Sequence, residues 1–151
     1  MFNGCSKLST MPALTAITTI GVRGYYNMFG YCTSLNTVSE LPATTISERS
    51  YEKMYDHCSS LSTAPAISAT TLAPSCCQYM FLGCINLLSA PALPATTLAE
   101  NCYTGMFQSC SSLSAINPNN LNKVTTLQPS CYIKMFSTCL GLSSTPVDLF
   151  S

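Results

Sequence analysis

The chain has 151 residues, enough for one domain with a sizeable core. Six Lys and Arg residues balance six Asp and Glu residues, and only 8% of the chain is charged, against about 25% in typical domains. This balance gives no electrostatic basis for binding nucleic acid or an anionic membrane. The sequence has no apolar run long enough to span a bilayer, so no transmembrane span is expected.

One motif recurs along the whole sequence. Each copy is anchored by a Met, with a Cys four residues later and a Leu seven residues later. Such a period predicts a solenoid, a propeller or an array, so residues 1–151 are expected to form a single repeat array. The chain opens inside one repeat and stops inside another, which predicts a fragment of a longer solenoid without its own signal peptide. The anchors are Met1, Met28, Met54, Met80, Met106 and Met135, at spacings of 27, 26, 26, 26 and 29 residues.

The first predicted element of each repeat is a short helix around the anchor Met. In the fifth repeat the apolar residues fall at offsets 0, 1, 4, 5 and 8, which is typical of one face of an α-helix. A Pro or Glu six residues before the Met suits a first helical turn. We therefore predict one helix of roughly ten residues per repeat, too short to be stable without its neighbours. These apolar residues are Cys102, Tyr103, Met106, Phe107 and Cys110.

The second predicted element is a short strand that begins at the repeat Leu, as at 35–38, 61–64 and 113–116. A Pro follows in four repeats, and because Pro lacks the ladder donor, each strand is expected to end there after three or four residues. These residues are Pro12, Pro65, Pro91 and Pro146.

A corner with a pair of Thr residues follows, at 18–19, 44–45, 70–71, 96–97 and 125–126. Neighbouring residues in an extended stretch face opposite ways, so only one Thr of each pair is expected to face solvent. We expect the Thr hydroxyls to make hydrogen bonds to the backbone at the corner. Ice or crystal binding by a Thr ladder is a minor alternative. The three extra residues of the fifth repeat fall near 117–120, a turn-rich cluster.

One strand, one corner and one helix make a coil, and coils stacked in parallel rise by about 4.8 Å each. The sequence therefore predicts an α/β solenoid, a leucine-rich-repeat-like stack of about five and a half coils, each a short parallel strand plus a short helix. Its predicted internal ladder consists of Met28, Cys32, Leu35, Met54, Cys58, Leu61, Met80, Cys84, Leu87, Met106, Cys110, Leu113, Met135, Cys139 and Leu142.

The pattern Tyr-x-x-Met-Phe-x-x-Cys-x-x-Leu, followed by Ala-Pro-x-Leu-Pro-Ala-Thr-Thr-Leu, resembles the BspA-like leucine-rich repeats of bacterial surface proteins, to which mycoplasma-type surface lipoprotein repeats are related. The resemblance covers essentially the whole chain, and it departs at Tyr55, which replaces Phe, and at 117–122. It implies a right-handed solenoid with a parallel sheet on one face, an extracellular or cell-surface location, and adhesion or protein binding. The family has no shared catalytic residue, so none is transferred.

No catalytic, cofactor or metal site is predicted. The ten Cys residues include no Cys-x-x-Cys pair, and their regular spacing favours packing over metal binding. Thiols in register point the same way, which disfavours disulfides and leaves Cys76–Cys77 as the pair that could bridge. His57 lies between Asp56 and Cys58, but adjacent helical residues point in different directions, which argues against a nucleophilic site.

The aromatic residues divide into two groups. Tyr at the repeated position three residues before the Met is expected at the edge of the core, with its hydroxyl in water. Tyr26, Tyr31 and Tyr55 lie off that position and could add exposed binding surface.

The predicted function is non-enzymatic recognition of a protein or host-surface ligand through one face of the stack. The alternative is a structural subunit whose copies stack end to end into a fibre, because neither end shows a polar cap and open strand edges template pairing. The candidate binding face follows each repeat Leu and comprises Asn36, Thr37, Ser62, Thr63, Leu88, Ser89, Ser114 and Ala115.

Overall fold

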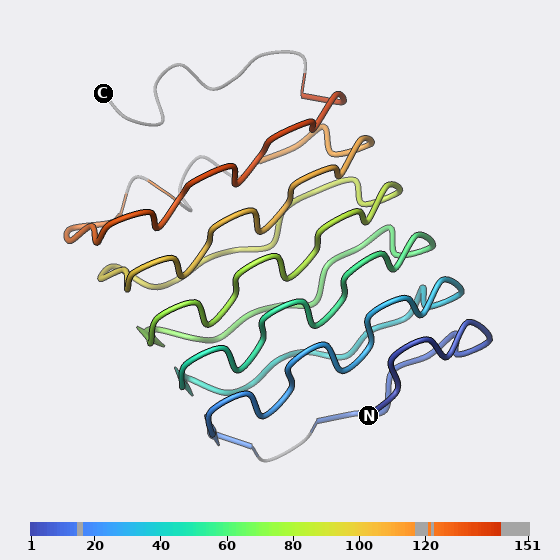
Figure 1. Ribbon diagram of the computed structural model, residues 1–151, viewed down its shortest axis with the longest axis horizontal. Coiled ribbons are helices and arrows are strands. Elements are labelled where there is room, and N and C mark those ends of the chain that lie inside the picture. The colour runs from blue at the N-terminus through green and yellow to red at the C-terminus, as the bar shows by residue number, and fades with distance from the viewer. Residues whose placement is uncertain (15–16, 117–120, 122, 143–151) are drawn as a thin grey trace.

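The chain winds as a series of coils stacked on one another, and its colour runs from blue at one end of the stack to red at the other (Figure 1). This is a computed structural model, and it describes residues 1–14, 17–116, 121 and 123–142. The insertion predicted near 117–120 and the strand end predicted at Pro146 lie outside these residues.

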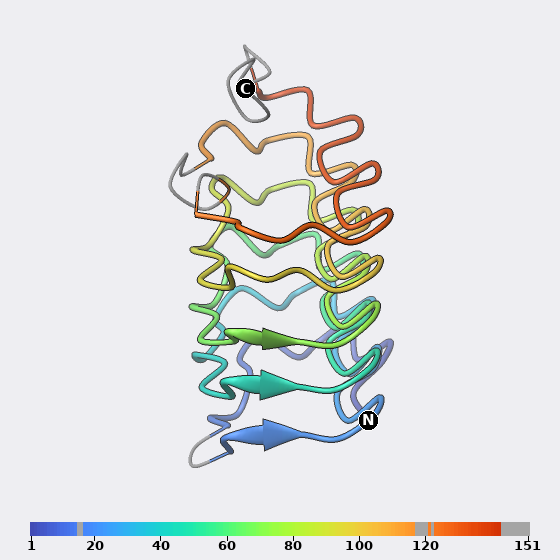
Figure 2. The ribbon, with the colours of Figure 1, turned by 90° about the vertical axis from the view of Figure 1, so that its left-hand side faces the viewer.

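Three short strands pair into an open parallel sheet in the order β1-β2-β3 (Figure 2). They are β1 (Thr19–Ile20), β2 (Thr45–Ile46) and β3 (Thr71–Leu72). Thr19 lies opposite Thr45, and Thr45 lies opposite Thr71. A parallel bridge between Thr97 and Thr126 continues the row in the later coils. Each repeat therefore contributes one short parallel segment to the same side of the stack.

The strands lie at the Thr pairs, where corners were predicted, so the predicted strand positions were wrong. At 35–38 and 113–116 the chain makes only isolated bridges, Thr10 with Thr37 and Ser89 with Ala115. There, two consecutive N–H groups donate to one carbonyl, as Asn36 and Thr37 do to Ser9 at 3.1 and 3.2 Å. The regular alternation that a longer strand needs is interrupted at that point.

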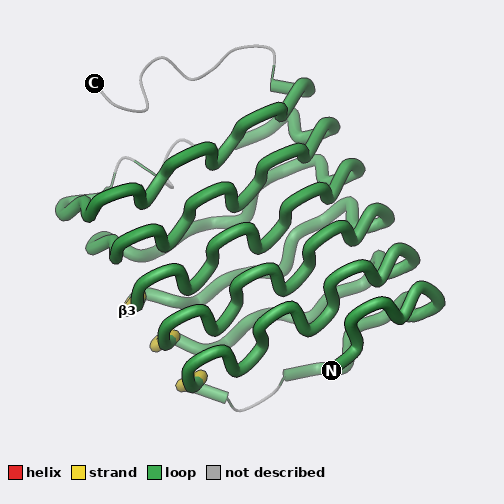
Figure 3. The backbone as a smooth tube through the Cα atoms, in the orientation of Figure 1, coloured by secondary structure: helices red, strands yellow, loops and turns green. Residues whose placement is uncertain are grey.

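The predicted helices were also wrong, because no helix forms among the described residues (Figure 3). Each predicted helix is instead a turn run, a series of overlapping β-turns that ends at the repeat Cys. Every second N–H donates three residues back, as Met28 does to the Tyr25 carbonyl at 3.2 Å. The N–H groups between them donate to the next coil, as Phe29 does to the Met54 carbonyl at 2.9 Å. A helix would keep all of these bonds within one coil, whereas half of them here join neighbouring coils. The turn runs span 21–32, 47–58, 73–84, 99–110 and 128–139.

The backbone of the turn runs is left-handed at fixed positions. Among the described residues, thirteen non-glycine residues and three glycines have positive φ, and all of them stand five residues before, one residue before or three residues after an anchor Met. The third residue of a type II turn requires positive φ, and Tyr31 occupies that place in the turn closed by Cys32 and Phe29. The turn runs therefore repeat every four residues rather than every 3.6.

The core lies between the turn runs and the return segments behind them (Figure 1). Its centre is an aromatic ladder in which successive rings stack with centroids 5.4–5.8 Å apart and planes within 8°. Tyr55 is fully buried in this ladder, so its expected exposure was wrong, and its hydroxyl donates to Met11 Sδ at 3.0 Å. The predicted Met, Cys and Leu ladder residues are buried, apart from the half-buried Leu142. The aromatic ladder comprises Phe2, Phe29, Tyr55, Phe81, Phe107 and Phe136.

Candidate functional site: the turn face

The predicted binding face forms a continuous column along one side of the stack. The Leu88 N–H donates to the Ser62 carbonyl, and the Ser114 N–H donates to the Leu88 carbonyl, both at 3.1 Å. All eight side chains are exposed except that of Ser62, which is half-buried. Apart from Leu88 and Asn36 they are small, and none is charged. This column is therefore neutral and offers mostly small side chains.

A different surface carries most of the charged side chains and the exposed rings of Tyr26 and Tyr31. We define the turn face as the surface formed by three columns of residues with positive φ, together with the residues adjacent to them in the sequence. Four of the six basic residues lie in these columns, and they are Arg23, Arg49, Lys53 and Lys134. The remaining members are mostly Ser, Thr, Asn or Gly. The columns are Arg23, Arg49, Ser75, Asn101 and Ser130; Asn27, Lys53, Tyr79, Gly105 and Lys134; and Gly4, Tyr31, His57, Gly83, Ser109 and Thr138.

Two buried carboxylates lie beneath this face in the third coil. Glu52 is 8% exposed, and its Oε2 lies 3.5 Å from Nε of Arg49. Asp56 is 5% exposed, and its Oδ1 contacts Nδ1 of His57. Because a buried carboxylate needs a partner, both acids are committed to neighbours on the turn face. Of the three acids in this turn run, Glu48 is the one with an exposed side chain, at 55%.

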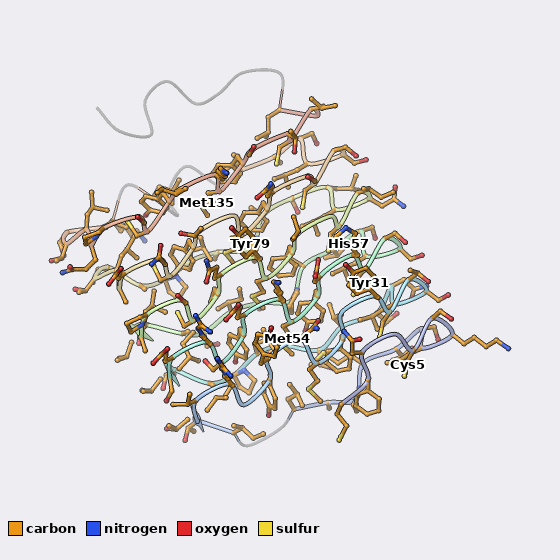
Figure 4. All side chains as sticks on the ribbon, viewed as in Figure 1. Cys5, Tyr31, Met54, His57, Tyr79 and Met135 are labelled. Atoms are coloured by element: carbon orange, nitrogen blue, oxygen red, sulfur yellow. The ribbon has the colours of Figure 1, made fainter. Side chains whose placement is uncertain are left out.

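Two basic side chains of the turn face and its histidine lie beside aromatic rings. The guanidinium of Arg23 is 5.8 Å from the Tyr26 ring centroid, and Nζ of Lys53 is 6.0 Å from that of Tyr79, both within cation–π range. His57 stacks on Tyr31 with centroids 4.8 Å apart and planes 3° apart. Figure 4 shows Tyr31 and His57 close together near one edge of the molecule, with Tyr79 farther along.

Two glycines let these rings lie against the next coil. A Cβ on Gly83 would stand 2.9 Å from Cδ2 of His57, and a Cβ on Gly105 would stand 2.3 Å from Cε1 of Tyr79. Both glycines also have positive φ, +70° and +58°, which other residues adopt at a cost. The rings of His57 and Tyr79 are therefore positioned by the absence of a side chain one coil away.

Most of the thiols are buried within the stack. All ten Cys residues are free, the Cys76–Cys77 pair included, and all except Cys5 are buried. In the aligned ladder each buried thiol donates to the carbonyl of the aromatic residue in the preceding coil, as Cys58 does to Phe29 at 3.1 Å. Burial raises the pKa of the Cys58 thiol to about 12, and a thiol rather than a thiolate is a poor nucleophile or metal ligand. Among the described residues, no group of three or more His, Cys, Asp and Glu side chains could hold a metal ion.

Both Thr residues of every pair are exposed, so the expectation of one exposed Thr per pair was wrong. Thr44 and Thr45 both donate their N–H to the Thr18 carbonyl, at 3.1 and 3.4 Å, and Thr70 and Thr71 do the same to Thr44. Two consecutive N–H groups directed at one acceptor remove the alternation of side chains that an extended strand imposes. The pairs form one hydroxyl-rich column that includes the first residue of each strand of the sheet.

Comparison with known proteins adds no relative: no family model, no curated protein and no solved structure matches this chain. In the part of the chain that the structure describes, no helix is long and apolar enough to cross a membrane.

The sequence does not predict the turn face as a site. Tyr26 and Tyr31 are predicted as candidates for exposure, and both are exposed. No sequence pattern connects them with Lys53, His57 and Tyr79. The signal that could have found them is the repeat itself, because basic or aromatic residues recur one residue before and three residues after the anchor Met.

Proposed function

We propose that this chain is a non-enzymatic recognition scaffold, a leucine-rich-repeat-like stack displayed at a cell surface, which binds a protein or host-surface ligand through its turn face. Surface display and adhesion are what the BspA-like pattern of its repeats implies. The observation that carries the proposal is the arrangement of cations and rings in columns on a uniform stack.

Each repeat has constant inward positions and variable outward positions, and this pattern supports the proposed function. Met, Phe, Leu and Cys recur at the inward positions, whereas the outward positions of the turn runs change from Arg to Lys, Tyr, His or Gly. A stack that keeps its interior constant and varies its surface presents different side chains at fixed intervals. Tyr and Arg are also the side chains enriched at binding hot spots.

The turn face suits recognition better than the face that follows each repeat Leu. Tyr31 and His57 are rigid rings that are already stacked, so fixing them in a complex costs little further entropy. The other column offers Ser, Thr and Ala side chains with little contact area. Leu88, which is 54% exposed, is its one large apolar group.

Binding by the immobilised chain to a panel of purified extracellular proteins and polysaccharides, measured by biolayer interferometry, tests this proposal. We expect the triple variant Lys53→Ser, His57→Ser, Tyr79→Ser to bind a ligand found for the wild type about tenfold more weakly, or worse. The matched control is Thr63→Ser, Leu88→Ser, Ser89→Ala, which changes the other face. Loss of binding in the control alone, with the triple variant unaffected, would move the site away from the turn face.

The exposed Thr column favours a second candidate function, binding to ice or another crystal surface. Thr19, Thr45 and Thr71 stand in register through the sheet, and their neighbours in the pairs are also exposed. Thermal hysteresis of the wild type and of Thr45→Lys, Thr71→Lys tests it. Activity in the wild type that the double variant loses would support this function, and an inactive wild type would exclude it.

A further inference from the structure

Two cations of the turn face are left without an acidic partner. In the part of the chain that the structure describes, Arg23 and Lys53 form no ion pair, and their side chains donate no hydrogen bond. A guanidinium group carries five N–H donors, and an ammonium group carries three. These donors are therefore available to a ligand.

Aromatic rings hold both cations in place. The guanidinium carbon of Arg23 lies 5.8 Å from the centroid of the Tyr26 ring, and Nζ of Lys53 lies 6.0 Å from that of Tyr79. A cation–π contact is an attraction to the face of the ring, so it leaves N–H groups free for hydrogen bonds to an anion. Because each head group already has a favoured position, fixing it in a complex costs less entropy than fixing a free side chain.

The two cations belong to neighbouring turn runs. The Arg23 N–H donates to the Glu48 carbonyl at 3.0 Å, and the Asn27 N–H donates to the Glu52 carbonyl at 2.9 Å. These bonds join the turn run at 21–32 to the turn run at 47–58, which contains Lys53. One ligand that lies across the two turn runs can therefore contact both cations.

The acids of the same region are already engaged. Glu48 and Glu52 lie 3.8 and 3.5 Å from Nε of Arg49. The carboxylate of Asp56 contacts the His57 ring. The chain as a whole has six basic and six acidic residues, and this balance conceals the local arrangement. The turn face carries unpaired positive charge where these two turn runs meet.

Apolar surface flanks one of the two cations. Val22 is 67% exposed and Tyr26 is 41% exposed, on either side of Arg23 in the sequence. A ligand that covers Arg23 also covers this surface, and burying apolar area is favourable when the ligand supplies an apolar side chain. A protein segment supplies such side chains beside its carboxylates, whereas a sulfated polysaccharide is polar along its length. The surface therefore favours a protein ligand.

We propose that the turn face binds an acidic segment of a protein ligand, whose carboxylates accept hydrogen bonds from the Arg23 guanidinium and the Lys53 ammonium group. The guanidinium can hold a carboxylate through two parallel N–H···O bonds, and an apolar side chain of the segment lies on Val22 and Tyr26. Arg and Tyr are among the residues enriched at protein–protein interfaces. This inference rests on the proposed recognition by the turn face and names the chemistry of the partner.

Fluorescence anisotropy with a labelled poly-L-glutamate peptide as the probe tests the acid-binding site. We expect the wild type to bind it, with an affinity that falls as salt is added. Arg23→Gln, Lys53→Gln should bind about threefold to tenfold more weakly, since two exposed ion pairs are lost. The matched control is Lys7→Gln, Lys123→Gln, which removes the same charge from two exposed residues outside the turn face and should bind like the wild type. A wild type that does not bind, or equal weakening in the two variants, overturns the proposal.

A copolymer of Glu and Tyr and the sulfated polysaccharide heparin separate the two kinds of anionic ligand. The copolymer should bind more tightly than poly-L-glutamate of equal charge, because its rings can contact Val22 and Tyr26. Val22→Ser should remove this difference and leave the binding of poly-L-glutamate unchanged. Heparin binding that depends on Arg23 and Lys53, with no binding of either peptide, would overturn the protein ligand in favour of a polysaccharide.

The same double variant distinguishes failure of this inference from failure of the proposed function. A ligand may be found whose binding the turn-face variant Lys53→Ser, His57→Ser, Tyr79→Ser loses. If Arg23→Gln, Lys53→Gln binds that ligand like the wild type, recognition by the turn face stands and the acidic partner is overturned. If neither variant changes ligand binding, recognition lies elsewhere on the stack, whatever the result with poly-L-glutamate.

Discussion

Cys84 donates its thiol hydrogen to the backbone carbonyl of Tyr55, one coil earlier, over 3.1 Å. Cys110 makes the same bond to Phe81 at 3.1 Å, and Cys139 makes it to Phe107 at 3.0 Å. The accepting carbonyl also receives an N–H bond within its own coil, as Tyr55 does from Cys58 at 3.1 Å. A buried carbonyl has two lone pairs to satisfy, and a small side chain with a donor supplies the second bond. The Cys ladder is therefore part of the coil-to-coil hydrogen bonding.

Removing one of these thiols should destabilise the fold. We expect Cys84→Ala to lower the free energy of unfolding by about 1–2 kcal/mol, because it removes a buried hydrogen bond and leaves a small void. Urea denaturation followed by circular dichroism measures the change. Cys5→Ala is the matched control, since Cys5 is exposed, and it should change stability by less than about 0.5 kcal/mol. Equal losses in the two variants would contradict a role for the thiol bond.

Alkaline pH should destabilise the protein through its buried thiols. Burial raises the pKa of Cys58, Cys102 and Cys110 from 9.0 to about 12. Above pH 9 the unfolded chain loses these protons while the folded chain keeps them, so the unfolded state gains the advantage. Their contribution to stability is complete below pH 9 and is lost as pH rises toward 12. Thermal melts at pH 7, 9 and 10.5 should show a constant midpoint up to about pH 9 and then a fall. A midpoint that is unchanged at pH 10.5 would contradict the burial of these thiols.

The repeat and its interior could be predicted from the sequence, because Met, Cys and Leu recur at fixed offsets in every copy. The turn runs could not. Cys102, Tyr103, Met106, Phe107 and Cys110 fit a helix of 3.6 residues per turn and a four-residue turn repeat equally well over so short a stretch. What decides between them is the bonding of alternate N–H groups to the neighbouring coil, which no single repeat encodes.

The candidate site could not be predicted for the same reason, because its arrangement depends on turn runs and not on helices. Arg23, Lys53 and His57 have positive φ, and residues of these types rarely signal a left-handed backbone as Gly or Asn do. On a helix they would scatter around its outer side. On a turn run they fall into columns, which brings His57 onto Tyr31 from the preceding coil. The exposure of both Thr residues of a pair could not be predicted either, because side chains alternate only in a regular strand, and two consecutive N–H groups share one acceptor here.

Tyr51 offers a test of an unsatisfied buried group. Its hydroxyl oxygen is buried and has no hydrogen-bond partner among the residues that the structure describes, a condition that costs about 1–3 kcal/mol. We expect Tyr51→Phe to raise the free energy of unfolding by about 1 kcal/mol, since the ring and its stacking on Tyr25 are retained. In the matched control, Tyr55→Phe, the lost hydroxyl donates to Met11, so no gain is expected. Chemical denaturation of both variants decides the matter, and a loss of stability in Tyr51→Phe would show that its hydroxyl is satisfied in solution.

Gly83 should be among the least replaceable residues of the turn face. Its φ is +70°, and an added Cβ would press on the His57 ring at 2.9 Å. We expect Gly83→Ala to cost about 1–2 kcal/mol for the left-handed backbone, and to move His57 off Tyr31. Gly21→Ala is the matched control, because a Cβ there meets nothing within 4 Å and its φ lies outside the left-handed region. That variant should stay within about 0.5 kcal/mol of the wild type. Denaturation gives the stability, and the ring-current shifts of the His57 and Tyr31 protons in NMR spectra report the stack. Unchanged shifts in Gly83→Ala would mean that the glycine does not position the ring, whatever the change in stability.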